Sequence, residues 1–207
     1  DGRATQGGYS TQIVVDENYV LRIPSALSPA GAAPLLCAGI TTYSPLRHWS
    51  VGKYHKLAVV GLGGLGHMAV KIAKAMGTEV TVLSTSEQKR KDAERLGACE
   101  FALTSQPETF TRLQRHFDCI LDTVSAPHNY NDYVNLLKTD GTMILVGVPD
   151  KPTLLEPFPL ILHRRRIAGS VIGGIRETQE MLDFCATHKI ESDVEVVPIQ
   201  QVNEAYE

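Results

Sequence analysis

The stretch that decides the fold runs from Leu57 to Gly66 and reads LAVVGLGGLG. Its first four residues are all apolar, which is typical of a short strand buried on both faces of a parallel sheet. The next six residues satisfy the pattern G-x-G-x-x-G, and a helical pattern of small and aliphatic residues then runs to Gly77. A strand, a glycine-rich turn and a helix in this order predict a βαβ unit with a dinucleotide site at the turn.

The glycines of this turn have separate expected roles. Gly61 permits the tight turn, Gly63 lets the backbone approach a pyrophosphate, and Gly66 lets helix and strand pack closely. The pyrophosphate would lie at the helix N-terminus, where free N–H groups and the helix dipole favour anions. The alternative is a glycine turn that binds nothing. We expect the whole turn to bind cofactor: Gly61, Leu62, Gly63, Gly64, Leu65 and Gly66.

The end of the next expected strand, residues 79–83, indicates which dinucleotide binds. An NAD enzyme usually has Asp or Glu here, about 20 residues beyond the glycines, to bind the ribose hydroxyls. This chain has Ser84, Thr85 and Ser86, followed by Lys89 and Arg90. Hydroxyls and a cation would bind a 2′-phosphate that a carboxylate would repel. The alternative is that Ser86 only caps the next helix, whose solvated face carries the two cations. We expect NADP(H).

Strand and helix patterns alternate along most of the chain, which predicts an α/β fold with a doubly wound parallel sheet of the Rossmann type. The expected helices are 32–48, with a kink or division at Pro45, and then 67–76, 87–96, 108–116, 130–137 and 178–188. The expected strands of the sheet are 57–60, 79–83, 100–103, 117–124, 142–148 and 166–172. Residues 11–15, 19–24 and 194–198 also have β character.

Composition excludes several functional classes. The chain has 207 residues, is 43% hydrophobic and has a formal net charge of −3. This balance argues against nucleic-acid or membrane-surface binding, since both favour a basic face, and no apolar run could span a bilayer. The four cysteines form no CxxC pair, and we expect reduced thiols in the cytoplasm. They are Cys37, Cys99, Cys119 and Cys185.

Four motifs, taken in order, carry a resemblance to a known family. They are PLLCAGITTY at 34–43, GLGGLGHMAVK at 61–71, STS at 84–86 and AGSVIGG at 168–174. Together they resemble the cinnamyl-alcohol-dehydrogenase branch of the zinc-containing medium-chain alcohol dehydrogenases, and most of all its bacterial NADP-dependent aldehyde reductases. The resemblance covers essentially the whole chain. It implies an oxidoreductase that interconverts small alcohols and aldehydes by zinc-assisted hydride transfer.

The resemblance also implies domains and site residues. Residues 31–189 would form the NADP-binding domain, through which relatives form homodimers. Residues 1–30 and 190–207 would be remnants of a β-rich, GroES-like catalytic domain. Cys37 matches a protein ligand of the catalytic zinc, and Thr41 would lie near the nicotinamide. The 2′-phosphate would be bound by Ser84, Thr85, Ser86 and Lys89. Further positions match the nicotinamide end of the site: Thr123, Gly147, Val148, Ser170, Val171 and Ile172.

The chain departs from the family pattern in ways that limit the expected activity. The family's other zinc ligands, its His-Glu pair and its proton-relay hydroxyl all lie N-terminal to the part of the family pattern that this chain matches. Catalytic zinc needs three protein ligands, which Cys37 alone cannot supply. We therefore assign no catalytic residue and expect the chain alone to be catalytically incomplete. Relatives usually have Gly where this chain has Tyr54, a change that would cost stability if φ is positive, and Asp where it has Cys99.

Two other functions remain open. The chain could be a nucleotide-binding or dimerisation module without turnover, or part of a zinc-free quinone reductase of the same superfamily. Several residues also have ordinary structural interpretations. His67 is expected to pack or to face solvent, and residues 163–166 are expected to form a solvated approach to a strand. Nothing in the sequence pairs Asp118 or Asp122 as an acid–base couple.

Overall fold

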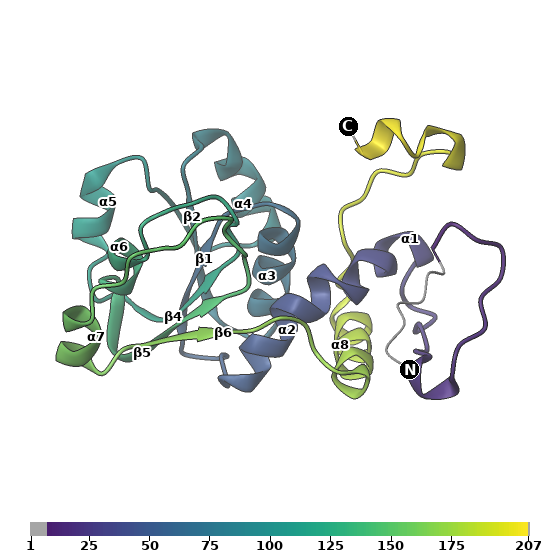
Figure 1. Cartoon of the computed structure of the whole chain (residues 1–207), viewed down its shortest axis with the longest axis horizontal. Coiled ribbons are helices and arrows are strands. Elements are labelled where there is room, and N and C mark those ends of the chain that lie inside the picture. The colour runs from purple at the N-terminus through teal and green to yellow at the C-terminus, as the bar shows by residue number, and fades with distance from the viewer. Residues whose placement is uncertain (1–7, 207) are drawn as a thin grey trace.

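The computed structural model describes residues 8–206 and contains a parallel sheet of six strands, which lies in the left half of Figure 1 with helices around it. The spatial order is β3-β2-β1-β4-β5-β6, and every neighbouring pair is parallel. This is the doubly wound Rossmann order, as the sequence predicts. The strands are β1 (Lys56–Val60), β2 (Glu79–Ser84), β3 (Glu100–Leu103), β4 (Phe117–Asp122), β5 (Leu137–Leu145) and β6 (Arg166–Gly169).

Helices cover both faces of this sheet, and each face has its own core. Leu57 and Val59 of β1 point into one core, while Ala58 and Val60 point into the other, because successive side chains alternate along a strand. The first core includes side chains of α2 (Ala38–His48), α3 (Gly64–Ala75), α4 (Arg90–Leu96) and α8 (Ile175–His188). The second includes side chains of α5 (Pro107–Arg112), α6 (Tyr130–Val134) and α7 (Phe158–His163).

Two glycines end helices where the sequence predicts. Gly77 follows α3 with φ +81° and Gly97 follows α4 with φ +104°, the left-handed conformation that glycine adopts without a steric penalty. One 3-10 turn, η3 (Glu87–Lys89), precedes α4. The elements from β1 to β3 therefore agree with the sequence-based expectation.

The break in the first helical region lies at Cys37 and not at Pro45, so the expected site of division is wrong. The region consists of α1 (Pro29–Ala32), the 3-10 turn η2 (Ala33–Leu36) and α2, and Cys37 has non-helical φ and ψ of −125° and −74°. Pro45 lies inside α2 and removes one backbone hydrogen bond. The helix continues through this position, and the side chains of Ile40 and Leu46 on either side of it are buried in the core.

The β-like segments 11–15, 19–24 and 194–198 form no strands, so these expectations are wrong. A strand is stable only with a neighbour to pair with, and no described strand lies beside them. Val14 is 99% exposed and Val196 is 80% exposed, so neither side chain is buried as the alternation predicts. Three 3-10 turns occur at these ends instead: η1 (Glu17–Tyr19), η4 (Ile199–Gln201) and η5 (Glu204–Tyr206).

Several element ends also differ from the expected ones. The helix expected at 130–137 stops at Val134, because Leu136 and Leu137 are fully buried in the second core and Leu137 already begins β5. The helix expected at 108–116 stops at Arg112, before Arg115 with φ +56°. Strands β4 and β6 end two or three residues early, and α8 begins three residues early. No helix within residues 8–206 has the length and hydropathy needed to cross a bilayer.

Candidate cofactor-binding site

The glycine turn has the geometry that the sequence predicts. Gly61 has φ +86°, and its N–H donates to the carbonyl of Leu83 at 2.9 Å. A Cβ atom at position 66 would lie only 2.2 Å from the carbonyl oxygen of Gly61, so the close approach of α3 to β1 requires glycine there. Around Gly63, the N-cap of α3, no atom lies within 4 Å of such a Cβ position. The backbone at the start of α3 is thus open to a ligand.

A pocket of about 450 Å³ lies beside this turn, at the carboxyl ends of β1 to β4. Strand order reverses between β1 and β4, which is where open α/β sheets bind their ligands. The pocket brings together seven of the residues expected to bind cofactor: Gly61, Leu62, Gly63, Ser84, Thr85, Ser86 and Lys89. The rest of its wall comes from Val60, Leu83, Thr104, Val124, Ala126, Pro127, His128 and Tyr133.

The polar groups at the end of β2 differ in their exposure. Thr85 and Lys89 are exposed and Ser86 is partly exposed, whereas Ser84 is buried and its Oγ accepts from the N–H of Ser86 at 3.2 Å. Ser86 precedes η3, but its side chain makes no capping hydrogen bond, so the capping alternative is not what the structure contains. Lys89 is exposed and has no ion-pair partner in the described part of the chain. Arg90 differs, because it pairs with Glu87 and lies 4.7 Å from the ring centre of Phe101. Lys89 is therefore the cation that faces the pocket.

The other expected cofactor residues lie outside this pocket. Gly64, Leu65 and Gly66 form the first turn of α3. Thr123 follows β4 and donates its hydroxyl to the carbonyl of Val60 at 2.7 Å. The remaining ones follow β5 and β6 along the same edge of the sheet: Gly147, Val148, Ser170, Val171 and Ile172. These residues thus lie at the carboxyl ends of the strands, as the pocket does, but they do not line it.

The last two expected residues, Cys37 and Thr41, lie directly before helix α2 and on it. Thr41 is 6% exposed, and Cys37, directly before the helix, is exposed. The helix packs beside the segment that follows β6, since a Cβ at Gly173 would lie 2.6 Å from Cδ1 of Ile40. Residues 8–206 contain no group of three His, Cys, Asp or Glu side chains that could hold a metal ion. Cys37 alone does not fit a zinc site.

The sequence reasoning missed a pair of titratable residues at the pocket. Asp122, the last residue of β4, is 1% exposed, and its Oδ2 lies 2.9 Å from Nε2 of His128. The hydrogen bond to this carboxylate raises the pKa of His128, against the opposing effect of its partial burial. Asp118 also has a basic partner, Lys138 at 2.8 Å. No local sequence pattern predicts these pairs, because the two residues of each pair lie on different loops or strands.

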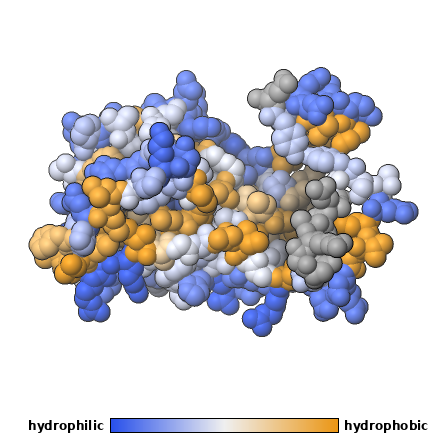
Figure 2. All heavy atoms as spheres, in the orientation of Figure 1, coloured by the Kyte–Doolittle hydropathy of each residue, from blue (hydrophilic) through white to orange (hydrophobic). Residues whose placement is uncertain are grey.

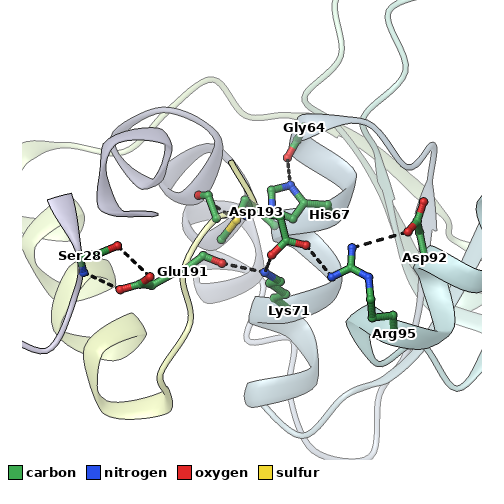
Figure 3. Close-up of polar contacts among 10 residues, drawn as sticks. Ser28, Gly64, His67, Lys71, Asp92, Arg95, Glu191 and Asp193 are labelled. Atoms are coloured by element: carbon green, nitrogen blue, oxygen red, sulfur yellow. Dashed lines mark hydrogen bonds and ion pairs between the residues drawn. The ribbon is translucent and has the colours of Figure 1, made fainter. Parts of the chain in front are cut away.

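His67 takes part in a polar network away from the pocket wall (Figure 3). Its Nδ1 lies 3.0 Å from the carbonyl oxygen of Gly64, and its Nε2 accepts from the N–H of Asp193 at 3.2 Å. The Asp193 carboxylate accepts from Lys71 at 2.6 Å and from Arg95 at 2.7 Å, and these hydrogen bonds lower its pKa to about 2. His67 therefore has a structural role, as expected, and binds Asp193 to α3, while Arg95 binds Asp193 to α4.

The sheet order, the glycine turn and the pocket at the reversal point define a dinucleotide-binding domain. Residues 64–187, more than half of the chain, match the model of the family described as zinc-binding dehydrogenase. The chain belongs to this family.

Individual relatives and solved structures allow a more detailed comparison than the family model. The chain is 58% identical over its full length to an NADP-dependent alcohol dehydrogenase C of Mycolicibacterium smegmatis and spans 59% of that protein. It is 57% identical to the aldehyde reductase YahK of Escherichia coli over 98% of its length and spans 59% of that protein. A cinnamyl alcohol dehydrogenase from Sorghum bicolor superposes with a TM-score of 0.89 at 44% identity, covering 92% of this chain and 55% of the other. The CAD from Helicobacter pylori complexed with NADP(H) superposes with 0.87 at 42% identity, covering 97% and 57%.

Proposed function

We propose that this chain is the NADP(H)-binding part of an oxidoreductase that interconverts alcohols and aldehydes. The observation that carries the proposal is the pocket in which Ser84, Thr85, Ser86 and Lys89 lie beside an open glycine turn, without a carboxylate at the end of β2. The names of the relatives support the same activity. When bound, the cofactor supplies a hydride that passes between its C4 and a carbonyl carbon.

Each part of the site has a proposed task. The turn from Gly61 to Gly66 holds the pyrophosphate on the N–H groups at the start of α3. The hydroxyls of Ser84, at the end of β2, and of Thr85 and Ser86, which follow it, bind the 2′-phosphate together with Lys89 through charge-assisted hydrogen bonds. The residues at the ends of β4, β5 and β6 line the nicotinamide end, together with Thr41: Thr123, Gly147, Val148, Ser170, Val171 and Ile172.

We place the domain boundaries near residues 31 and 189, with 1–30 and 190–207 belonging to a catalytic domain. In the longer protein, Cys37 would be one zinc ligand among several from residues outside this chain. In that case this chain by itself would bind cofactor without turnover, which is the second candidate function. The four free cysteines support a cytoplasmic location.

A homodimer formed through the cofactor domain is also part of the proposal. Strand β6 lies at the end of the strand order, so one of its edges has no described partner. Apolar side chains are exposed beside it on α7, at the left of Figure 2, where Phe158 is 67% exposed and Ile161 is 71% exposed. Val171 and Ile172, which follow β6, are exposed as well. An unpaired strand edge flanked by apolar side chains suits pairing with a second copy.

Cofactor titration tests the proposal. We expect the chain to bind NADPH more tightly than NADH in a fluorescence titration. Substituting Lys89→Met removes one charge-assisted contact and is expected to weaken NADPH about tenfold while leaving NADH unchanged. Lys91→Met is the matched control, because Lys91 lies on α4 and does not line the pocket. A preference for NADH, or no binding of either nucleotide, would contradict the proposal.

Zinc analysis and an aldehyde assay on the same sample separate the two candidate functions. A nucleotide-binding part without turnover predicts no stoichiometric zinc and no oxidation of NADPH by any aldehyde. Stoichiometric zinc together with aldehyde reduction would show that this chain is complete as an enzyme. The third possibility, a zinc-free quinone reductase, is not favoured by the named relatives.

A further inference from the structure

Strand β4 ends in a buried carboxylate that contacts His128, a residue of the wall of the proposed cofactor pocket. Asp122 is the last residue of β4, at the position where the strand order reverses. One of its oxygens accepts from the N–H of Val124 at 3.1 Å, and the other lies against His128 at 2.9 Å. A carboxylate at this edge would repel the phosphates of a dinucleotide, for the reason that an acidic residue after β2 disfavours a 2′-phosphate.

The hydrogen-bond partners of His128 determine its protonation. Its Nδ1 lies 2.8 Å from the carbonyl oxygen of Ala126, which can only accept, so Nδ1 carries a proton. The second proton lies between Nε2 and Oδ2 of Asp122. With both protons in place, the imidazole and the carboxylate together have no net charge. His128 thus cancels the charge of Asp122.

The ring of His128 is held in the pocket wall. The rings of Tyr130 and Tyr133 contact it edge-on, with centroid distances of 5.0 and 5.4 Å. His128 and Tyr133 line the same pocket as Lys89, which is the other cationic group there. The charged and titratable groups around His128 are therefore Asp122 on β4, the two tyrosines of α6, and Lys89 across the pocket.

We propose that His128 is a positioning and specificity residue for the phosphorylated dinucleotide, because it neutralises Asp122 and so lets the pocket accept a strongly anionic ligand. The proposal rests on the proposed function, namely NADP(H) binding in this pocket. It assigns a role to two residues that lie outside the glycine turn and outside the serine-threonine-serine segment after β2. Neither residue takes part in hydride transfer.

The test is a set of three variants titrated with NADPH and with NADH. His128→Gln keeps a hydrogen-bond donor but leaves Asp122 without a cation, and is expected to weaken NADPH about tenfold. The loss for NADH is expected to be smaller, because NADH lacks the 2′-phosphate. The double variant D122N/H128Q restores neutrality and is expected to recover NADPH binding to within about threefold of the wild type. His116→Gln is the matched control, because His116 directly precedes β4, at the amino ends of the strands, and does not line the pocket.

A second measurement does not depend on the folding of any His128 variant. Above about pH 7 the 2′-phosphate is at least nine-tenths ionised, since its second pKa is about 6, so its own charge changes little as pH rises further. The hydrogen bond to Asp122 raises the pKa of His128, so the imidazole holds its second proton to a higher pH than a free histidine does. Wild-type affinity for NADPH relative to NADH is then expected to fall as pH rises, and Asp122→Asn is expected to remove that fall.

The outcomes separate the two proposals. If the wild type binds NADPH and His128→Gln binds it equally well, His128 has no such role and the inference fails while the proposed function stands. If D122N/H128Q binds NADPH as weakly as His128→Gln, the loss comes from a structural effect of the substitution and not from the charge of Asp122, and the inference also fails. If the wild type does not bind NADPH, the proposed function fails and this inference fails with it.

Discussion

Tyr54 has a backbone conformation that its side chain opposes. It lies in the turn between α2 and β1 with φ +75°, and its side chain is 86% exposed. Its ring contacts Nζ of Lys53, which lies 4.9 Å from the ring centre. A bulky residue in the left-handed region is a conformational outlier. Glycine, which the family resemblance leads us to expect here, would adopt this φ freely.

The size of the effect follows from three opposing contributions. The left-handed conformation costs an L-residue about 1–2 kcal/mol, which Tyr54→Gly would recover. Against this, glycine loses more backbone entropy on folding, by roughly 0.5–1 kcal/mol. A cation–π contact at an exposed site contributes about 0.5 kcal/mol. The net expectation is a stabilisation of up to about 1 kcal/mol, or about 2–4 °C in Tm for a chain of this size.

Thermal and urea unfolding of Tyr54→Gly and Tyr54→Ala tests this reasoning. Both variants remove the ring and its contact with Lys53, but only glycine removes the Cβ atom that makes a positive φ costly. We expect the glycine variant to melt above the wild type and the alanine variant to melt at or below it. A glycine variant no more stable than the alanine variant would refute the argument that backbone strain at Tyr54 costs stability.

Two further predictions concern the glycine turn and the network around Asp193. Gly66→Ala places a methyl group 2.2 Å from the carbonyl oxygen of Gly61 and is expected to lower the free energy of unfolding by about 3 kcal/mol. Gly63→Ala, with open space at its Cβ, should unfold at the wild-type urea concentration and lose dinucleotide affinity. Asp193 has its pKa lowered to about 2, so its contribution is present near neutral pH and disappears as pH falls from about 4 towards 2. Its half-exposed carboxylate limits that contribution to about 1 kcal/mol. It is measured as the difference in urea unfolding between wild type and Asp193→Asn, and a difference that does not shrink as pH falls from about 4 to about 2 would contradict this assignment.

The sheet could be predicted because its signals are local. A wholly apolar run such as 57–60 is compatible with a strand covered on both faces, and Gly77 and Gly97 end the following helices through their own backbone preferences. The segments 11–15 and 194–198 have equally good alternation, but a strand also needs a neighbour, and none of the described strands pairs with them. Alternation shows which face could be buried and not whether a partner exists.

The site could be predicted only as far as its motifs reach. The glycine turn and the residues after β2 follow from the sequence, but the choice between Lys89 and Arg90 does not. Arg90 does not line the pocket, because its guanidinium pairs with Glu87 and lies over the ring of Phe101 on β3. The pairing of Asp122 with His128 likewise depends on how the loop after β4 folds back. Contacts between side chains on separate elements set these details, and the spacing of residues does not encode them.

The contacts of residues 28–31 with 191–193 have a consequence for how the domain joins the rest of a chain. The Ser28 hydroxyl donates to Glu191 at 2.9 Å, and the N–H of Ser192 donates to the carbonyl of Gly31 at 3.1 Å. With the proposed domain boundaries, the chain enters and leaves the cofactor domain at neighbouring positions, as an inserted module does. Such modules tolerate circular permutation and transplantation between hosts. A short linker from Asp193 to Ser28, with new termini in a surface loop, should preserve the whole sheet.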